Sequence, residues 1–280
     1  MSDLIDAVIK TREISTEIAA QSLKSLIGAS EVDIHELILS GMSTHDSIFP
    51  KGWYAPPPGG ASVLFDQNPF ERLKYDSLRN PTYWPQKNSV FNKETVASIY
   101  FSPVDRVTGM MGDIGFTIYT GDNEEIKKHL NSVYESILEV AKYIEIGMKI
   151  SDICEFAKNL FKDKFRRTRW VTISSDPGQS INLGHSVAGS SEGKFIVRNN
   201  FDELVETLKN KRIHLIDTET SLIPETCAFI VESRLEDINK PYLPSAYFQF
   251  IVCFDKGRKT ILRNIDDIIK LVGMNYINTN

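Results

Sequence analysis

The sequence predicts an α+β fold: a single domain over residues 1–280 made of two similar halves, each with a pair of helices and a set of strands. Three observations predict it. Long segments repeat apolar residues at helical spacing, shorter segments are rich in β-branched and aromatic residues, and one glycine-to-aspartate pattern occurs twice. The share of hydrophobic residues, 41%, is that of a globular protein and excludes collagenous, coiled-coil and disordered classes.

The first segment, residues 4–39, is predicted to form two helices separated by a break at Gly28. Apolar residues recur there every three or four positions, which is the period of an amphipathic helix. After Gly28, either Ser30 or Asp33 can cap the second helix, because a short polar side chain accepts the free amide hydrogens of a first turn.

Residues 41–90 contain prolines and glycines in clusters that exclude regular helix. They also contain many aromatic residues, beginning with Trp53 and Tyr54 and ending with Trp84. Aromatic side chains favour burial, so we expect a packed loop and no domain boundary. Such a loop could close a cleft and restrict it to small ligands, with Trp53 and Tyr54 as substrate-binding residues; it could equally pack against the core or a second subunit.

Two β-rich runs, residues 96–104 and 115–119, flank a turn that ends at Gly109 and predict a hairpin. A long helical pattern follows over residues 122–144, then Gly147, then a helix over 151–161.

These last features repeat the opening of the chain. Gly28 and Gly147 each stand five residues before an aspartate, at a constant offset of 119 residues. Duplication therefore predicts that the two glycines occupy equivalent helix breaks, although two unrelated helices could share such stop and cap residues.

The last third predicts short strands over 170–173, 213–216, 228–231 and 247–254, a helix over 201–209 and a terminal helix over 265–272.

Charge and cysteine content narrow the classes of partner. The formal net charge is -5 and no long basic run occurs, which argues against nucleic acid as a partner. The three cysteines are widely spaced, so we expect no disulfide framework and a reducing compartment. No stretch has the roughly 20 apolar residues that span a bilayer. We therefore expect a cytoplasmic protein that binds no membrane, with a homodimer as a candidate assembly.

Three residues are candidates for chemistry. Asp113 lies among apolar and small residues, where a carboxylate must be protonated, hydrogen-bonded or bound to a metal, unless it only accepts turn hydrogen bonds. His185 lies between small residues that permit close approach by a substrate or an ion, although a lone histidine is more often structural. Glu232 ends an apolar strand, where an ordinary solvated residue is the alternative. The other four histidines are expected to be exposed.

The order of these features carries a resemblance to a known family. Helix, glycine and helix come first, followed by Gly109 four residues before Asp113, then Gly184-His185, then Glu232 and a strand that ends at Asp255. This order resembles the pita-bread fold of methionine aminopeptidases, Xaa-Pro aminopeptidases and creatinase over nearly the whole chain. The resemblance implies two pseudo-symmetric halves with a curved antiparallel sheet covered by helices.

The metallopeptidases of this family hold two divalent metals with two Asp, one His and two Glu. The resemblance places Asp113, His185 and Glu232 on three of these ligands. The other two positions fall on Ser102 and Gln249, which are not carboxylates and are expected to bind substrate. Two cations need bridging carboxylates, so at most one metal is expected, held by Asp113, His185 and Glu232: Fe, Mn, Co or Zn, or none.

The histidines that this family's peptidases use for proton transfer are also missing, because residues 69–94 and 186–195 contain no histidine. Creatinase keeps the fold without metals and uses the histidine as acid and base. By this resemblance we expect an enzyme that cleaves or rearranges a C–N or C–O bond of a small amino-acid-like or amidine-like molecule. His185, Glu232 and Asp113 would be catalytic. The alternatives are a mononuclear aminopeptidase-like hydrolase and a non-catalytic protein that binds a peptide or a protein.

Overall fold

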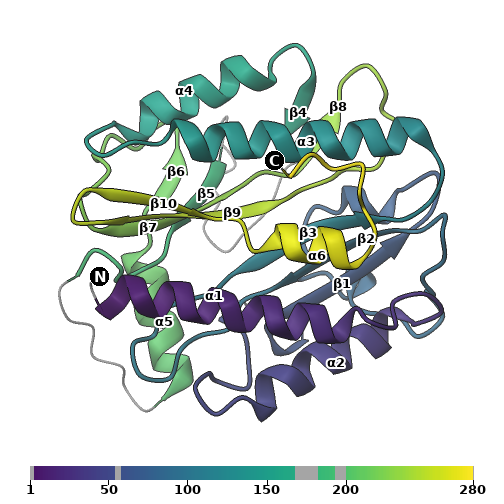
Figure 1. Cartoon of the computed structure of the whole chain (residues 1–280), viewed down its shortest axis with the longest axis horizontal. Coiled ribbons are helices and arrows are strands. Elements are labelled where there is room, and N and C mark those ends of the chain that lie inside the picture. The colour runs from purple at the N-terminus through teal and green to yellow at the C-terminus, as the bar shows by residue number, and fades with distance from the viewer. Residues whose placement is uncertain (1–2, 54–57, 168–181, 193–199, 280) are drawn as a thin grey trace.

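The computed structural model describes residues 3–53, 58–167, 182–192 and 200–279 of the chain (Figure 1). In the first half, the regular elements in chain order are α1 (Asp3–Ser22), α2 (Glu31–Thr44), β1 (Ala61–Asp66), β2 (Val96–Phe101) and β3 (Ile114–Tyr119). Single 3-10 turns cover Pro58–Gly60, Arg72–Lys74 and Pro81–Tyr83.

In the second half, two helices come first and strands follow. The elements are α3 (Glu124–Tyr143), α4 (Ile150–Phe161), β4 (Phe165–Arg167), β5 (Asn182–Ser186), α5 (Phe201–Lys211), β6 (His214–Ile216), β7 (Cys227–Glu232), β8 (Leu235–Asp237), β9 (Gln249–Asp255), β10 (Arg258–Leu262) and α6 (Ile265–Leu271).

The strands form antiparallel sheets. The first half contributes β1-β2-β3, and the second contributes β10-β9-β7-β5-β6 and the small pair β4-β8. An antiparallel bridge between Phe116 on β3 and Phe248, just before β9, joins the two larger sheets. Helices α1 and α2 lie along one side of the strands and α3 and α4 along the other, as Figure 1 shows. The predicted α+β fold with two halves is confirmed.

The buried faces of the helices explain how they pack. Helices α3 and α4 each bury one apolar stripe, and the stripe of α3 faces β7 and β9. Helix α1 lies against β3, β7 and β9, the strands that meet where the halves join. Burial of these stripes, at about 25 cal/mol per Å² of apolar surface, is the main favourable term that holds helices to sheets.

The predicted equivalence of Gly28 and Gly147 is confirmed by the backbone. The amide of Gly28 donates to the carbonyl of Phe91, and the amide of Gly147 donates to the carbonyl of Ile223, both at 2.9 Å. Isolated bridges two residues later pair Ser30 with Val90 and Lys149 with Leu222. Each helix pair is therefore tied at its break to a segment of its own half in the same way.

Both glycines have left-handed backbone conformations, with φ of 86° at Gly28 and 78° at Gly147. L-residues with a side chain rarely adopt this region, whereas glycine adopts it without steric cost. After the break, Ser30 caps α2 in a reciprocal pair with Asp33, which decides between the two predicted caps.

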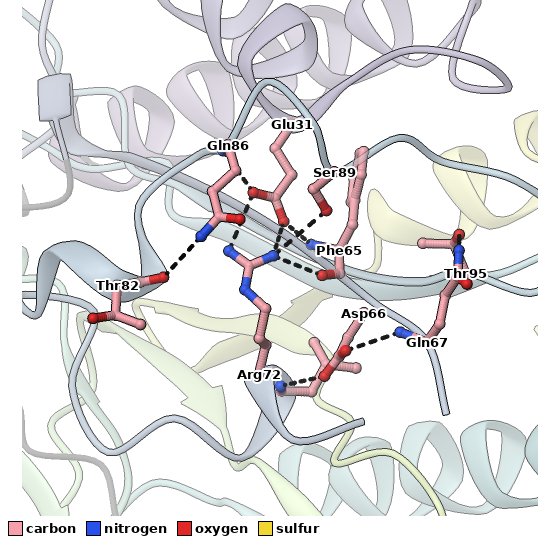
Figure 2. A network of polar contacts seen from close by, with 10 residues as sticks. Glu31, Phe65, Asp66, Gln67, Arg72, Thr82, Gln86, Ser89 and Thr95 are labelled. Atoms are coloured by element: carbon pink, nitrogen blue, oxygen red, sulfur yellow. Dashed lines mark hydrogen bonds and ion pairs between the residues drawn. The ribbon is translucent and has the colours of Figure 1, made fainter. Parts of the chain in front are cut away.

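A buried carboxylate organises the loop that follows β1. Glu31 is fully buried at the start of α2, and its two oxygens accept hydrogen bonds from Arg72 and from the amides of Phe65 and Gln86 (Figure 2). Arg72 also donates to the carbonyl of Phe65 at 2.9 Å. The ion pair between Glu31 and Arg72 thus fastens the aromatic segment after β1, residues 67–95, to both α2 and β1.

Residues 41–90 were expected to be a packed loop, but they include β1, which pairs with β2 over its full length. The strand was missed because flanking glycines and prolines masked a short apolar run. The expected strand over 170–173 lies outside the described residues. Within the described residues, no helix is long and apolar enough to cross a membrane.

Candidate functional site

Asp113 lies one residue before β3 and is fully buried. Its Oδ2 accepts hydrogen bonds from the indole Nε1 of Trp53 at 3.4 Å and from the hydroxyl of Tyr100 at 3.3 Å. Its other oxygen, Oδ1, is buried and has no hydrogen-bond partner among the described residues. The carboxyl group is therefore oriented by two donors and keeps one acceptor atom for another group.

His185 is brought to Asp113 by β5, the neighbour of β7. Its Nδ1 lies 2.9 Å from the carbonyl oxygen of Ser186, and a carbonyl only accepts, so Nδ1 carries the proton of the neutral ring. Its Nε2 lies 3.9 Å from Oδ2 of Asp113. That distance is beyond a direct hydrogen bond but suits a proton shared through a bridging polar atom. Trp53 packs edge-on against the imidazole at 5.6 Å between ring centroids.

Glu232 and Gln249 are directly opposite each other on β7 and β9. The amide Nε2 of Gln249 donates to Oε2 of Glu232 at 2.7 Å. Gln249 is fully buried, and its Oε1 has no hydrogen-bond partner within the described residues. The pair therefore presents a second buried acceptor atom beside a carboxyl group.

Burial dominates the electrostatics of these groups. It raises the pKa of Asp113 from 3.8 to about 7 and that of Glu232 from 4.5 to about 7, and the charge of Asp113 raises the pKa of Glu232 further. Burial, together with the charge of Arg212, lowers the pKa of His185 well below 6.5. Near neutral pH the imidazole is therefore neutral, and each carboxyl group takes up a proton far more readily than it would in water.

The structure places the predicted site residues that it describes in one region. Asp113, His185 and Trp53 lie together through the contacts above, and Glu232, paired with Gln249, lies near enough for the charge of Asp113 to raise its pKa. Ser102 is buried and adjoins them through its carbonyl, which accepts from the amide of Trp53 at 3.1 Å. Tyr54 lies outside the described residues. The catalytic and substrate-binding roles of all these residues stay predictions.

The expectation that the other four histidines are exposed was wrong. His35 and His129 are buried, and His214 is half-buried beside His185 at 6.3 Å between ring centroids. Their burial results from tertiary packing, which the neighbouring residues in the sequence do not predict. At Gly184 the backbone of β7 approaches closely, because a Cβ there would lie 2.1 Å from the carbonyl oxygen of Ile230.

Sequence reasoning missed two arginines near the site. The guanidinium of Arg212 lies over the ring of Trp53 at 4.7 Å. Burial lowers the pKa of both His185 and His214, and the charge of Arg212 lowers it further. Arg12 on α1 is fully buried and reaches the backbone of Asp113 and Gln249. The signal for Arg12 was available, since it lies four residues after Val8 on the buried face of α1.

The residues do not fit a metal ion as they are placed. In the described part of the chain, no group of three or more His, Cys, Asp and Glu side chains is arranged to hold one. Protein donors already occupy one oxygen of each carboxyl group: Trp53 and Tyr100 donate to Oδ2 of Asp113, and Gln249 donates to Oε2 of Glu232. A metal ligand must present its oxygen or nitrogen to the ion, so these contacts compete with coordination.

Comparison with solved structures identifies the fold. A methionine aminopeptidase from Thermotoga maritima superposes with a TM-score of 0.62 at 12% identity, over 93% of this chain and 96% of that one. An X-Pro aminopeptidase from the same organism gives 0.60 at 15% identity over 92% of this chain. A prolidase from Pyrococcus horikoshii gives 0.63 at 12% identity over 93% of this chain.

This chain spans 60% of the length of the X-Pro aminopeptidase and 62% of that of the prolidase. No protein-family model matches the sequence, and no curated protein matches it significantly. At such low identity, likeness of structure shows the fold alone. The chain has the pita-bread fold that these aminopeptidases and prolidases share.

Proposed function

We propose that the protein is an enzyme that acts on a small amino-acid-like or amidine-like molecule, with His185 as the acid and base and without a metal. The observation that carries this proposal is the pairing of His185 with Asp113. An imidazole nitrogen without a proton faces, at 3.9 Å, a carboxyl group whose pKa is about 7. Burial keeps the imidazole neutral and therefore able to accept a proton, and Asp113 in its ionised form would stabilise the imidazolium that results.

The class of substrate follows from the buried acceptors. Oδ1 of Asp113 and Oε1 of Gln249 have no hydrogen-bond partner in the described residues, and such buried acceptors are costly to leave unpaired. A substrate that carries N–H groups, such as an amine, amide or amidine, would supply the missing donors. The carboxyl groups of Asp113 and Glu232 would balance a positive charge on that substrate.

In the reaction that we propose, His185 and Asp113 assist the hydrolysis of a C–N bond. His185 Nε2 takes a proton from water, and the resulting hydroxide adds to the electrophilic carbon. The C–N bond then breaks as the imidazolium returns its proton to the leaving nitrogen, which restores the neutral ring. Asp113 in its ionised form stabilises the imidazolium, while Trp53 and Tyr100 keep the carboxyl group in place.

A panel of amino-acid amides, dipeptides and guanidino acids, assayed for released ammonia or amine, tests the proposal. We expect turnover of at least one compound, a loss of roughly 100-fold or more in His185→Ala, and retention in the matched control His45→Ala, whose ring contacts Ser47 outside the site. Undiminished turnover in His185→Ala would contradict the proposal. Binding of a compound without turnover would favour the non-catalytic alternative.

A further inference from the structure

Helix α1 delivers a fixed positive charge to the region where the two halves meet. Arg12 is fully buried. Its Nη1 donates to the backbone carbonyl of Asp113, and its Nη2 donates to the backbone carbonyl of Gln249 at 2.9 Å. One guanidinium therefore connects the start of β3 with the start of β9, through the backbone carbonyls of two residues of the candidate site, Asp113 and Gln249.

The backbone around Arg12 leaves it little freedom to withdraw. A Cβ at Gly112 would lie 2.4 Å from the carbonyl of Thr11 and 2.6 Å from the amide of Arg12, so α1 touches the chain just before Asp113. On the next turn of the helix, the hydroxyl of Ser15 donates to the carbonyl of Gly112. Glycine at position 112 thus permits a close approach that holds Arg12 beside Asp113.

The guanidinium keeps its charge despite burial. Burial lowers the pKa of Arg12 to about 9, and the neighbouring charge of Asp113 opposes that shift. The group is therefore protonated at neutral pH. Charges inside a protein interact more strongly than charges in water, because the surrounding medium screens them less.

A divalent cation bound to Asp113 and His185 would meet this charge at close range. The carboxyl groups available to compensate it are few, because Gln249 stands opposite Glu232 and contributes no charge. The charge of Arg12 therefore opposes the binding of a divalent cation, because a second and larger positive charge would enter the site. A neutral imidazole carries no charge and is not opposed in this way.

We propose that Arg12 is a built-in cation that takes the electrostatic place of a metal ion behind Asp113 and Gln249 and keeps divalent metals from the site. This inference extends the metal-free chemistry of the proposed function to the residue that enforces it. Arg12 is a positioning residue in this account, since it contacts the backbone of the site and not a substrate.

Calorimetric titration with Co²⁺ and with Zn²⁺ tests the proposal without any substrate. Three variants separate charge from hydrogen bonding: Arg12→Lys keeps the charge, Arg12→Gln keeps a donor without charge, and Arg12→Met removes both. We expect weak binding by the unmodified protein and by Arg12→Lys, and affinity at least about tenfold higher in Arg12→Gln and Arg12→Met. Adding Asp113→Asn to Arg12→Met should abolish the gain.

Equal affinity of the unmodified protein and folded Arg12→Gln would overturn the inference and leave the proposed function standing. Circular dichroism establishes which variants fold. The unmodified protein supplies a test that needs no Arg12 variant: submicromolar Co²⁺ or Zn²⁺ binding that Asp113→Asn removes would overturn the inference, and its absence supports it. Loss of turnover in His185→Ala tests the proposed function separately.

Discussion

The two helix breaks of this molecule have the same backbone conformation and equivalent backbone hydrogen bonds, but they bury different side chains. At the first break, Glu31 follows the cap residue Ser30; at the second, Ile150 follows Lys149 at the equivalent place. Glu31 and Ile150 are both fully buried. The amide of Glu31 donates to the carbonyl of Ser89 at 3.0 Å, and that of Ile150 donates to Ser221 at 3.1 Å.

The difference shows which part of a duplicated unit must be kept. Backbone hydrogen bonds and a left-handed glycine set the geometry of each break, and buried backbone groups leave little choice because they must be paired. The side chain after the cap only has to suit its surroundings. In the first half it meets Arg72 and the aromatic segment after β1, so a carboxylate serves there; in the second half it meets apolar residues.

Exchanging these side chains should produce the largest effect. Glu31→Ile places the second half's residue in the first half and leaves Arg72, 22% exposed in its side chain, without its carboxylate. We expect the free energy of unfolding to fall by about 3–5 kcal/mol, the usual cost of breaking a buried ion pair. Urea denaturation measures it.

The double variant Glu31→Ile with Arg72→Leu is the control, because it removes both charges together. It should recover part of the loss, since no charge is left without a partner. A loss below about 1 kcal/mol in Glu31→Ile would mean that the ion pair does not hold the aromatic segment.

A second prediction concerns the place where the halves meet. Because the pKa of Asp113 is raised to about 7, the folded state holds this proton more tightly than the unfolded chain does. This contribution to stability is full below the ordinary pKa of 3.8 and is lost as the pH rises through about 7. Asp113→Asn cannot titrate and should not show this loss.

Relative to the unmodified protein, Asp113→Asn should therefore gain about 2–3 kcal/mol in unfolding free energy between about pH 5 and about pH 8. Denaturation at several pH values measures this difference. Burial also raises the pKa of Asp66 on β1, so Asp66→Asn shows how large a change of the same sign arises from a carboxyl group outside the site. A difference between Asp113→Asn and the unmodified protein that stays constant with pH would show that Asp113 is not a buried, protonated group.

The smallest effect concerns the caps. Lys149 at the start of α4 makes no side-chain cap, although Asp152 stands three residues later as Asp33 does after Ser30. Lys149→Ser should create the reciprocal pair and stabilise the protein by about 0.5–1 kcal/mol, whereas Ser30→Ala should cost about 1 kcal/mol. Thermal unfolding measures both, and a destabilised Lys149→Ser would show that the second break differs in more than its side chain.

The regular elements were largely predictable because they depend on local rules. The helical spacing over residues 4–39 and 122–161 and the hairpin around Gly109 are patterns of neighbouring residues, and the structure confirms them. The equivalence of Gly28 and Gly147 could also be predicted, since both positions need a backbone that glycine adopts easily. The strand β1 escaped prediction because its pairing with β2 is a contact between residues distant in sequence.

The candidate site divides in the same way. Sequence alone determined that an aspartate, a histidine and a glutamate follow one another along the chain, and it predicted that they lie close together. Only the tertiary structure decided that Nε2 of His185 faces Asp113 and that Gln249 donates to Glu232. It also decided that Arg12 donates to the backbone carbonyls of Asp113 and Gln249. These contacts join residues from separate helices and strands, and their directions depend on packing, which no local pattern of residues records.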